Sequence, residues 1–419
     1  MSNRYRSMDA VLGCDRREFL QGVGACTVLA GGALLGVGPV YAQDEPKEKT
    51  GAQDRVRPPE PETNIGEFMK VPRAPGAIPG PFPGRVVEVK NVESLGGESL
   101  VADEIDGDIV REMLAEGILR LTGKDAGESF KLFFKEGDIV GLKVNPVGPP
   151  LINTKLELVD AVIAWLEEGG LPRKNIVIWD RFESMLTAAG YTEDRFPGVR
   201  IEALQMMDET GNSWRREDGK HISTEAFDMD AYYYAKGIEG KGVKGYQDDE
   251  FYLNQHVFNG EYSYFGKLIT KGLTKIINLP AFKNTGPGIS MATKNLGYAA
   301  VCNTGRLHVP LFFRVCTEVL AAPWIRDKLV LNILDALRGQ YDGGPDVNAQ
   351  FVYPNHTLYF ATDPFAIDMV GHLAITAKRK AMGVRVVDHP RYTDYLHQGE
   401  KLELGIADPK KIEHIKVSA

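Results

Sequence analysis

Cysteine is scarce in this chain of 419 residues, which contains four cysteines and no C-x-x-C pair. Iron–sulfur clusters are held by several cysteine thiolates, so we expect no iron–sulfur cluster within the chain. Cys14 and Cys26 lie near the N-terminus, which leaves Cys302 and Cys316 for the remainder. A disulfide between these two is one interpretation, but the apolar helical pattern around Cys316 favours two buried thiols.

Other features that would define a class of protein are missing as well. The net charge is −8, and no basic run is interleaved with aromatic residues, so we expect no nucleic-acid partner. The sequence contains no G-x-S-x-G elbow, and its eight histidines form no H-E-x-x-H or other close pair. A serine-triad hydrolase therefore has no support from the sequence.

The N-terminus carries the pattern of an export signal. Residues 15–20, DRREFL, resemble a twin-arginine motif, and an apolar segment rich in Gly and Ala follows over residues 23–40. Val40-Tyr41-Ala42 provides compact residues for signal peptidase, so we expect a signal peptide over residues 1–42. An uncleaved membrane anchor is the alternative, which the many glycines disfavour. A lipoprotein site at Cys26 is weaker, because few apolar residues precede it.

This signal predicts a periplasmic or extracellular protein that has no lasting membrane span and is exported by the twin-arginine machinery. That machinery transports folded proteins, often with a cofactor already inserted. The signal therefore favours a bound cofactor or metal, but it does not identify one.

The remainder of the chain reads as a linker followed by one domain. Residues 43–84 are charged and Pro-rich, which predicts a disordered linker, although its second half could pack in extended form over the domain. Strand and helix patterns then alternate over residues 85–419, and this alternation predicts an α/β fold with a mostly parallel sheet flanked by helices. An irregular insertion interrupts the domain at about 205–262. The expected strands are 86–89, 139–144, 175–180, 273–280, 328–335 and 356–363, and the expected helices are 106–121, 155–168, 309–320, 364–381 and 391–397.

Polar residues lie at the ends of several expected strands. They are Lys143 and Asn145, Asp180, Lys283 and Asn284, Asp335, and Asp363. Ligands of open parallel sheets bind outside the carboxyl ends of the strands, so we expect a shared cleft there. Separate structural capping at each strand end is the alternative interpretation.

Residues 280–298, PAFKNTGPGISMATKNLGY, contain two Lys-Asn pairs around Gly286-Pro287-Gly288. The glycines break regular structure, and a helix with Ser290 as N-cap is expected to follow. Free N–H groups at this helix start, together with Lys283 and Lys294, would bind a carboxylate or phosphate. The loop is neither a Walker A loop nor a dinucleotide fingerprint. Two lysines in surface ion pairs remain the alternative.

Carboxylates and one histidine complete the candidate site. Asp335, Asp342 and Asp368 could hold a divalent cation such as Mg²⁺ or Ca²⁺, whose ligands are oxygens. A turn alone would explain Asp342, and Asp363 before Pro364 is expected to be a helix N-cap. His308 follows the second Lys-Asn pair, and its structural role is favoured over a role as ligand or proton shuttle.

These segments resemble those of the domain of unknown function family 362. The similar segments are GLKVN (141–145), NIVIWD (175–180), residues 277–298, ILDALRGQYDGGP (333–345) and ATDPFAIDMVG (361–371), within a span of about 86–385. The resemblance implies an association with ferredoxin-type clusters, for which this chain lacks the cysteines. The family often has a histidine near the first lysine of PAFKN, where this chain has Asn284-Thr285.

Together these patterns predict an exported enzyme that binds a small anionic substrate or cofactor and carries out cofactor- or metal-dependent redox chemistry with an electron-transfer partner. The expected catalytic residues are Lys283, Lys294, Asp335 and Asp368. The expected ligand-binding residues are Lys143, Asn145, Asp180, Asn284, Gly286, Gly288, Ser290, Asn295 and His308. The three lysines, Asp335 and Asp368 should then converge on one cleft. The alternative is a non-catalytic binding or maturation protein for an anion or metal complex.

Overall fold

The computed structural model describes residues 61–96, 105–205, 226–237, 261–308, 311–387 and 392–418. All of them belong to one compact unit, Lys49–Ala419. The expected signal peptide, the first part of the expected linker and most of the expected insertion lie outside the described residues. No helix in the described part of the chain is both long and apolar enough to cross a membrane.

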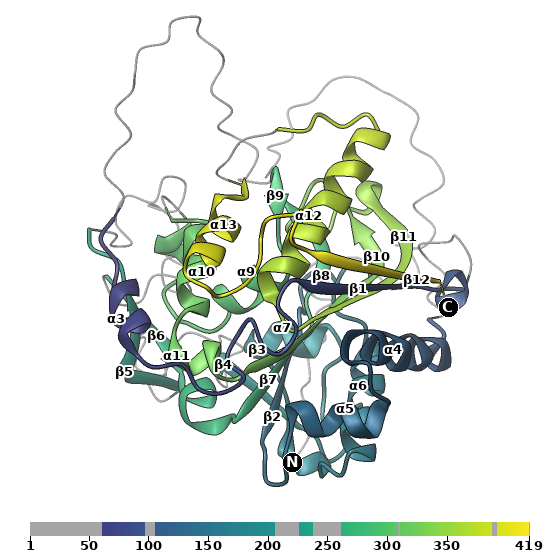
Figure 1. Cartoon of the computed structure of the whole chain (residues 1–419), viewed down its shortest axis with the longest axis horizontal. Coiled ribbons are helices and arrows are strands. Elements are labelled where there is room, and N and C mark those ends of the chain that lie inside the picture. Colours follow the sequence, from purple (N-terminus) through teal and green to yellow (C-terminus); the bar gives the residue numbers. More distant parts are fainter. Residues whose placement is uncertain are drawn as a thin grey trace, which may run out of the picture. The chain divides into compact units, whose positions relative to one another are not determined.

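A ten-stranded sheet forms the centre of this unit (Figure 1). Its main path runs β12-β1-β11-β10-β7-β2-β3-β4; β8 pairs with β10, and β9 pairs with β8. The five strands from β10 to β4 are mutually parallel, whereas β11 is antiparallel to both of its neighbours. The strands are β1 Arg85–Lys90, β2 Val140–Lys143, β3 Ile176–Phe182, β4 Arg200–Gln205, β7 Lys275–Asn278, β8 Ala281–Thr285, β9 Gly288–Ile289, β10 Leu329–Gln340, β11 Val352–Ala361 and β12 Glu413–Ser418. The predicted α/β fold with a mostly parallel sheet is thus confirmed.

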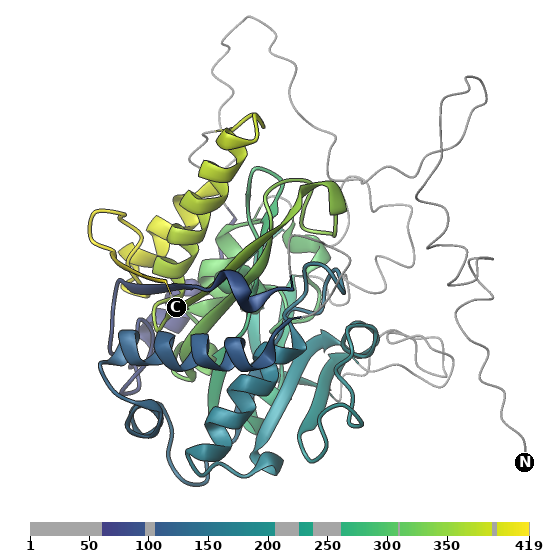
Figure 2. The same ribbon diagram turned by 90° about the vertical axis from the view of Figure 1, so that its right-hand side faces the viewer.

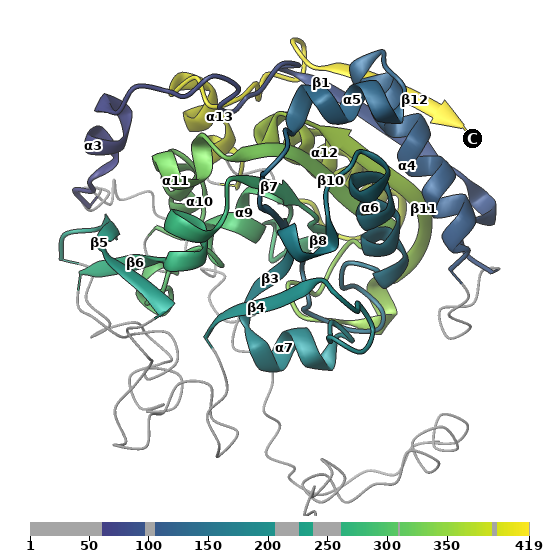
Figure 3. The same cartoon turned by 90° about the horizontal axis from the view of Figure 1, so that it is seen from below.

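Helices cover both faces of the sheet, which explains why its central strands are apolar on both sides. In β3, Ile176 and Ile178 join one hydrophobic core, and Val177 and Trp179 join another. Figure 3 shows α4 and α6 on the side of the sheet opposite α9 and α10. The helices are α3 Ile65–Lys70, α4 Gly107–Thr122, α5 Ala126–Phe133, α6 Leu156–Glu168, α7 Glu183–Ala188, α9 Ala292–Gly297, α10 Arg314–Leu320, α11 Pro323–Arg326, α12 Pro364–Ala381 and α13 Asp394–Lys401.

The long helix α4 packs closely along the sheet beside β1 (Figure 2). Asp106 caps its start by accepting hydrogen bonds from the N–H groups of Asp108 and Ile109. Gly117 allows the close approach, because a Cβ there would lie 2.2 Å from Cε2 of Phe360. The apolar face of this helix therefore rests directly on β11. Shorter helical turns are η3 Val92–Ser94, η4 Arg173–Asn175, η6 Leu268–Gly272, η7 Gly305–Leu307 and η8 Ala349–Phe351.

Residues 61–84, expected to belong to a disordered linker, are part of the fold. They contain α3, and they contribute Phe68 and Ile78 to the buried core. The fully buried guanidinium of Arg326 donates to the carbonyl oxygens of Phe68 and Pro72, at 3.2 Å in both cases. The ordered fold therefore begins before residue 85. Proline and charge predicted disorder, but they gave no sign of the buried arginine that holds this segment.

The expected insertion also contains regular structure at its described ends. β5, Phe227–Tyr234, pairs with β6, Tyr262–Gly266, in a separate antiparallel sheet. Residues 206–225 and 238–260 of the insertion lie outside the described residues. Helix α10 begins at Arg314 rather than at residue 309.

Candidate functional site

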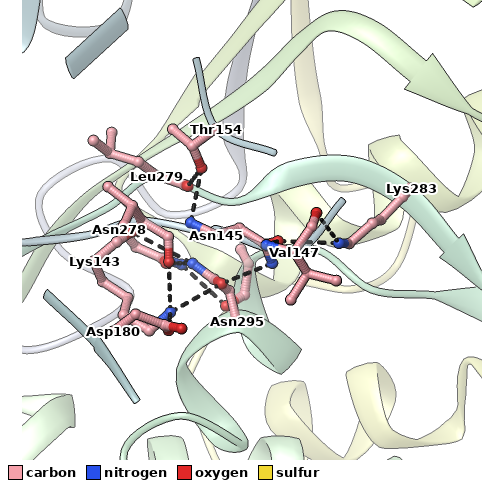
Figure 4. A network of polar contacts seen from close by, with 11 residues as sticks. Lys143, Asn145, Val147, Thr154, Asp180, Asn278, Leu279, Lys283 and Asn295 are labelled. Carbon is pink, nitrogen blue, oxygen red and sulfur yellow. Dashed lines mark hydrogen bonds and ion pairs between the residues drawn. The ribbon is translucent and has the colours of Figure 1, made fainter. Parts of the chain in front are cut away.

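One hydrogen-bonded network joins the polar residues near the carboxyl ends of β2, β3 and β7 (Figure 4). β2 contributes Lys143, β3 contributes Asp180, and β7 contributes Asn278. Lys283 on β8 and Asn295 on α9 complete it. Four of these five residues were predicted to share a cleft. The parallel register brings them together, because Lys143 pairs with both Trp179 and Asn278.

The hydrogen-bonding capacity of the Lys143 ammonium is used entirely within the protein. Its ammonium lies 2.6 Å from Oδ1 of Asp180, 2.7 Å from the carbonyl oxygen of Val144 and 3.1 Å from Oδ1 of Asn295. An ammonium has three donors, and all three have partners here. Burial lowers the pKa of Lys143, and the Asp180 carboxylate opposes this effect. Lys143 is therefore held in place by its neighbours in the network.

Two amides connect Lys143 to Lys283. Asn295 Oδ1 accepts from Lys143 and from Nδ2 of Asn145, at 3.1 Å in both cases. Asn145 Oδ1 in turn accepts from Lys283 Nζ at 3.0 Å. Asn295 Nδ2 donates to Asn278 Oδ1 at 2.8 Å. Each lysine thus turns an amide oxygen toward itself, and the orientation of both amides is fixed.

Lys283 differs from Lys143 because it has no carboxylate partner among the described residues. Its ammonium donates to Asn145 Oδ1 at 3.0 Å and to the carbonyl oxygen of Val147 at 3.2 Å, which leaves its third donor without an acceptor among the described residues. Its exposed fraction is 1%. Burial lowers the pKa of Lys283 to about 7; Lys294 and Lys143 add to this lowering, while Asp346 and Asp180 oppose it.

Lys294 and His308 lie together in an aromatic cluster. The Lys294 ammonium is 4.9 Å from the ring centroid of Tyr298 and 5.5 Å from that of Phe312. His308 Nδ1 lies 3.0 Å from the carbonyl oxygen of Thr304, so it carries the proton and donates. Burial, assisted by Lys294, lowers the pKa of His308 to about 3. His308 is therefore neutral at pH 7, which fits an acceptor and not a proton shuttle.

The helix start that was expected to bind an external anion is occupied by Asp368 of the chain itself. From α12, Asp368 accepts from the N–H groups of Ala292 at 2.7 Å and Thr293 at 2.9 Å, and from the Thr293 hydroxyl at 2.5 Å. Burial raises the pKa of Asp368 to about 7, against the effect of these donors. Ser290 is not the N-cap; that position is Met291. The prediction of a ligand site at this helix start is therefore wrong.

The three carboxylates proposed as metal ligands bind different segments of the chain. Asp335 lies within β10 rather than at its end, and it accepts from the N–H groups of Lys155 at 2.7 Å and Leu337 at 3.2 Å. Burial raises the pKa of Asp335 to about 6. Asp342 forms an ion pair with Arg379. Within the described ranges, no three His, Cys, Asp or Glu side chains are arranged to hold a metal ion.

The expected convergence is therefore partial. Lys143 and Lys283 meet through the amides, and Lys294 lies close enough to act electrostatically on Lys283. Asp335 and Asp368 contact backbone groups instead.

The remaining loop residues are held by contacts within the chain. Asn284 Nδ2 donates to the carbonyl oxygen of Gly286 at 2.9 Å, and Asn284 Oδ1 accepts from the N–H of Gly344 at 3.0 Å. Arg379 binds the carbonyl oxygens of Gly286 and Pro287. Gly286 has a φ of 51°, and a Cβ at Gly288 would lie 2.4 Å from the ring of Phe313. These contacts hold the loop that follows Lys283.

Two sequence expectations outside the network are resolved. Cys302 and Cys316 are free and buried, so the interpretation as two thiols is confirmed, and burial raises their pKa values to about 11 and about 12. Asp363 caps α12 as predicted, and its carboxylate also accepts from the N–H groups of Gly84 and Ile406.

Asn278 was missed, although its position at the end of β7 matches that of the other network residues. A single amide in the apolar run IINLP did not stand out as a site residue. The signal that could have found it is the shared strand-end position, which also distinguishes Lys143.

The fold and the site define an α/β protein with a buried lysine–amide network at the carboxyl ends of parallel strands. A family model described as Domain of unknown function (DUF362) matches residues 140–372, more than half of the chain, and the protein belongs to this family. The matched range contains every residue of the network. No curated protein matches the chain.

Proposed function

We propose that the protein is an exported enzyme that binds a small anionic substrate or cofactor beside Lys283 and Lys294. The observation that supports this most strongly is the Lys283 ammonium, which is almost completely buried and has no carboxylate partner in the described part of the chain. Burying a charge without a counter-ion is costly. A ligand that supplies negative charge would offset this cost. Lys294 adds a second positive charge that no described carboxylate pairs with.

The protonation of Lys283 favours catalysis over simple binding. Its pKa of about 7 allows the amine to gain or lose a proton at neutral pH, which general acid–base catalysis requires. Lys143, paired with Asp180 at 2.6 Å, lies nearby in the same network. The proposal also includes redox chemistry with a cofactor and a separate electron-transfer partner. Only the twin-arginine-like signal supports this part of it. A non-catalytic binding or maturation protein would need only the charge and shape of this site.

Anion binding tests the proposal directly. Isothermal titration with acetate, sulfate and phosphate should show binding to the wild type, and Lys283→Met should weaken it about tenfold or more, because a hydrogen bond to a charged group contributes about 1.5–3 kcal/mol. Lys294→Met should weaken it less, because no hydrogen bond fixes that ammonium. Equal affinities for the wild type and Lys283→Met would contradict the proposal.

Lys328→Met is a control for loss of a partly buried lysine. Its ammonium donates to the carbonyl oxygens of Ile269 and Thr270, at 2.6 and 3.2 Å, and burial lowers its pKa to about 8. Because Lys328 is not part of the network, its loss should leave anion affinity unchanged. Native mass spectrometry with elemental analysis of the exported protein would then identify a retained cofactor or metal, and turnover of a bound ligand would separate an enzyme from a binding protein.

A further inference from the structure

The Asp180 carboxylate has one oxygen that the network does not use. Oδ1 lies 2.6 Å from the Lys143 ammonium, whereas Oδ2 has no hydrogen-bond partner among the described residues. The residue is only 5% exposed. This oxygen can therefore accept a hydrogen bond from a ligand, which makes it a second candidate for contact with the ligand.

Asp180 and Lys283 offer opposite hydrogen-bonding chemistry at the two ends of one network. Lys283 has a spare donor, and Asp180 has a spare acceptor. Figure 4 shows Asn145 and Asn295 between them. The fixed amides hold these two ends at a constant separation, because Asn295 binds Lys143 and Asn145 binds Lys283. A ligand that satisfies both ends needs an anionic group and a donor group.

We propose that the ligand is a hydroxycarboxylate, whose carboxylate faces Lys283 and whose hydroxyl donates to Oδ2 of Asp180. This inference rests on the proposed anion site and adds a specificity-determining role for Asp180. An ammonium could also donate to Asp180, but the neighbouring charges of Lys143, Lys283 and Lys294 disfavour a second cation. A neutral hydroxyl avoids that repulsion.

Butyrate and its hydroxy derivatives test this inference, because they differ only in the presence and position of one donor. Isothermal titration of the wild type should show that at least one of 2-, 3- and 4-hydroxybutyrate binds about tenfold or more tightly than butyrate. A hydrogen bond to a charged group contributes about 1.5–3 kcal/mol, which corresponds to about 10- to 100-fold in affinity. The isomer that binds most tightly indicates the distance between the Lys283 ammonium and Oδ2 of Asp180.

Asp180→Asn should abolish this preference. The new amide oxygen would accept from Lys143, so the amide nitrogen would present a donor to the ligand in place of the Oδ2 acceptor. Asp346→Asn is the control. It removes the same charge from an exposed side chain that acts on Lys283 only electrostatically, so this variant should still bind the hydroxybutyrate more tightly than butyrate. If Asp180→Asn does not fold, the wild-type series alone decides the matter.

Each outcome of the series has a distinct meaning. Equal binding of butyrate and all three isomers, with binding that depends on Lys283, would overturn the hydroxycarboxylate inference and leave the anion site intact. Tighter binding of 4-aminobutyrate than of every hydroxy isomer would overturn the choice of a neutral donor. No binding of any of these compounds, or of the simple anions, would overturn both proposals.

Discussion

Lys143→Met is expected to lower the free energy of unfolding by about 3–5 kcal/mol, because removal of one partner leaves the other charge of a buried ion pair uncompensated. Asp180 would lose its only ion-pair partner within the described residues, at 2.6 Å. Asn295 Oδ1 would also lose a donor. Chemical denaturation of the wild type and the variant measures the effect.

A double-mutant cycle separates the ion pair from general damage to packing. Asp180→Asn combined with Lys143→Met should cost less than the sum of the two single changes, because the double variant removes both charges of the pair and leaves neither one without its partner. The exposed pair of Arg111 and Asp108, at 3.0 Å, provides a control, and Arg111→Met should cost less than about 1 kcal/mol. Strict additivity within the buried pair would mean that Lys143 and Asp180 do not stabilise each other.

Asp368→Asn is expected to lower the free energy of unfolding by about 2–4 kcal/mol. The amide nitrogen of the new side chain is a donor, and it would face N–H or hydroxyl groups of the protein that are donors themselves. Asp368 now accepts from two backbone N–H groups and from the Thr293 hydroxyl, and a buried donor without a partner costs about 1–3 kcal/mol. Helix α9 carries both Lys294 and Asn295, so the change should also weaken anion binding.

Asp342→Asn is the control for the loss of a carboxylate beside the same loop. Asp342 is partly exposed, and Arg379 keeps its bonds to the carbonyl oxygens of Tyr341, Gly286 and Pro287. Because Arg379 is buried but keeps these three acceptors, we expect a loss of about 1–2 kcal/mol, smaller than that for Asp368→Asn. Comparable losses for Asp342→Asn and Asp368→Asn would show that the cap of α9 contributes little to stability.

The sequence predicted the sheet and α12 well because their signals are local. Asp363-Pro364 combines an N-cap with a proline at the first helical position, and the helix runs over Pro364–Ala381 as expected. Lys143 and Asp180 were expected near strand ends, and the parallel register then places them in contact. Local pattern and sheet topology together were sufficient for this part of the site.

The roles of Asp335 and Asp368 could not be read from the sequence. Asp368 caps a helix that begins at Ala292, and no pattern within α12 indicates that distant partner. Asp335 falls inside a strand that continues to Gln340, so its position at a strand end was an error in the expected boundary. Both side chains satisfy backbone groups far away in sequence, and only tertiary packing determines which groups these are.

The pH dependence of anion affinity tests the central claim most directly. The pKa of Lys283 is lowered to about 7, so the ammonium loses its proton, and with it its charge, as the pH rises through 7. Sulfate keeps a constant charge between pH 6 and 8, and its affinity for the wild type should fall across this range. Asp368, whose pKa is about 7, titrates in the same window, so Lys283→Met serves as the reference. The account predicts weak and nearly pH-independent binding to that variant; a steep fall with pH in Lys283→Met, equal to that of the wild type, would contradict it.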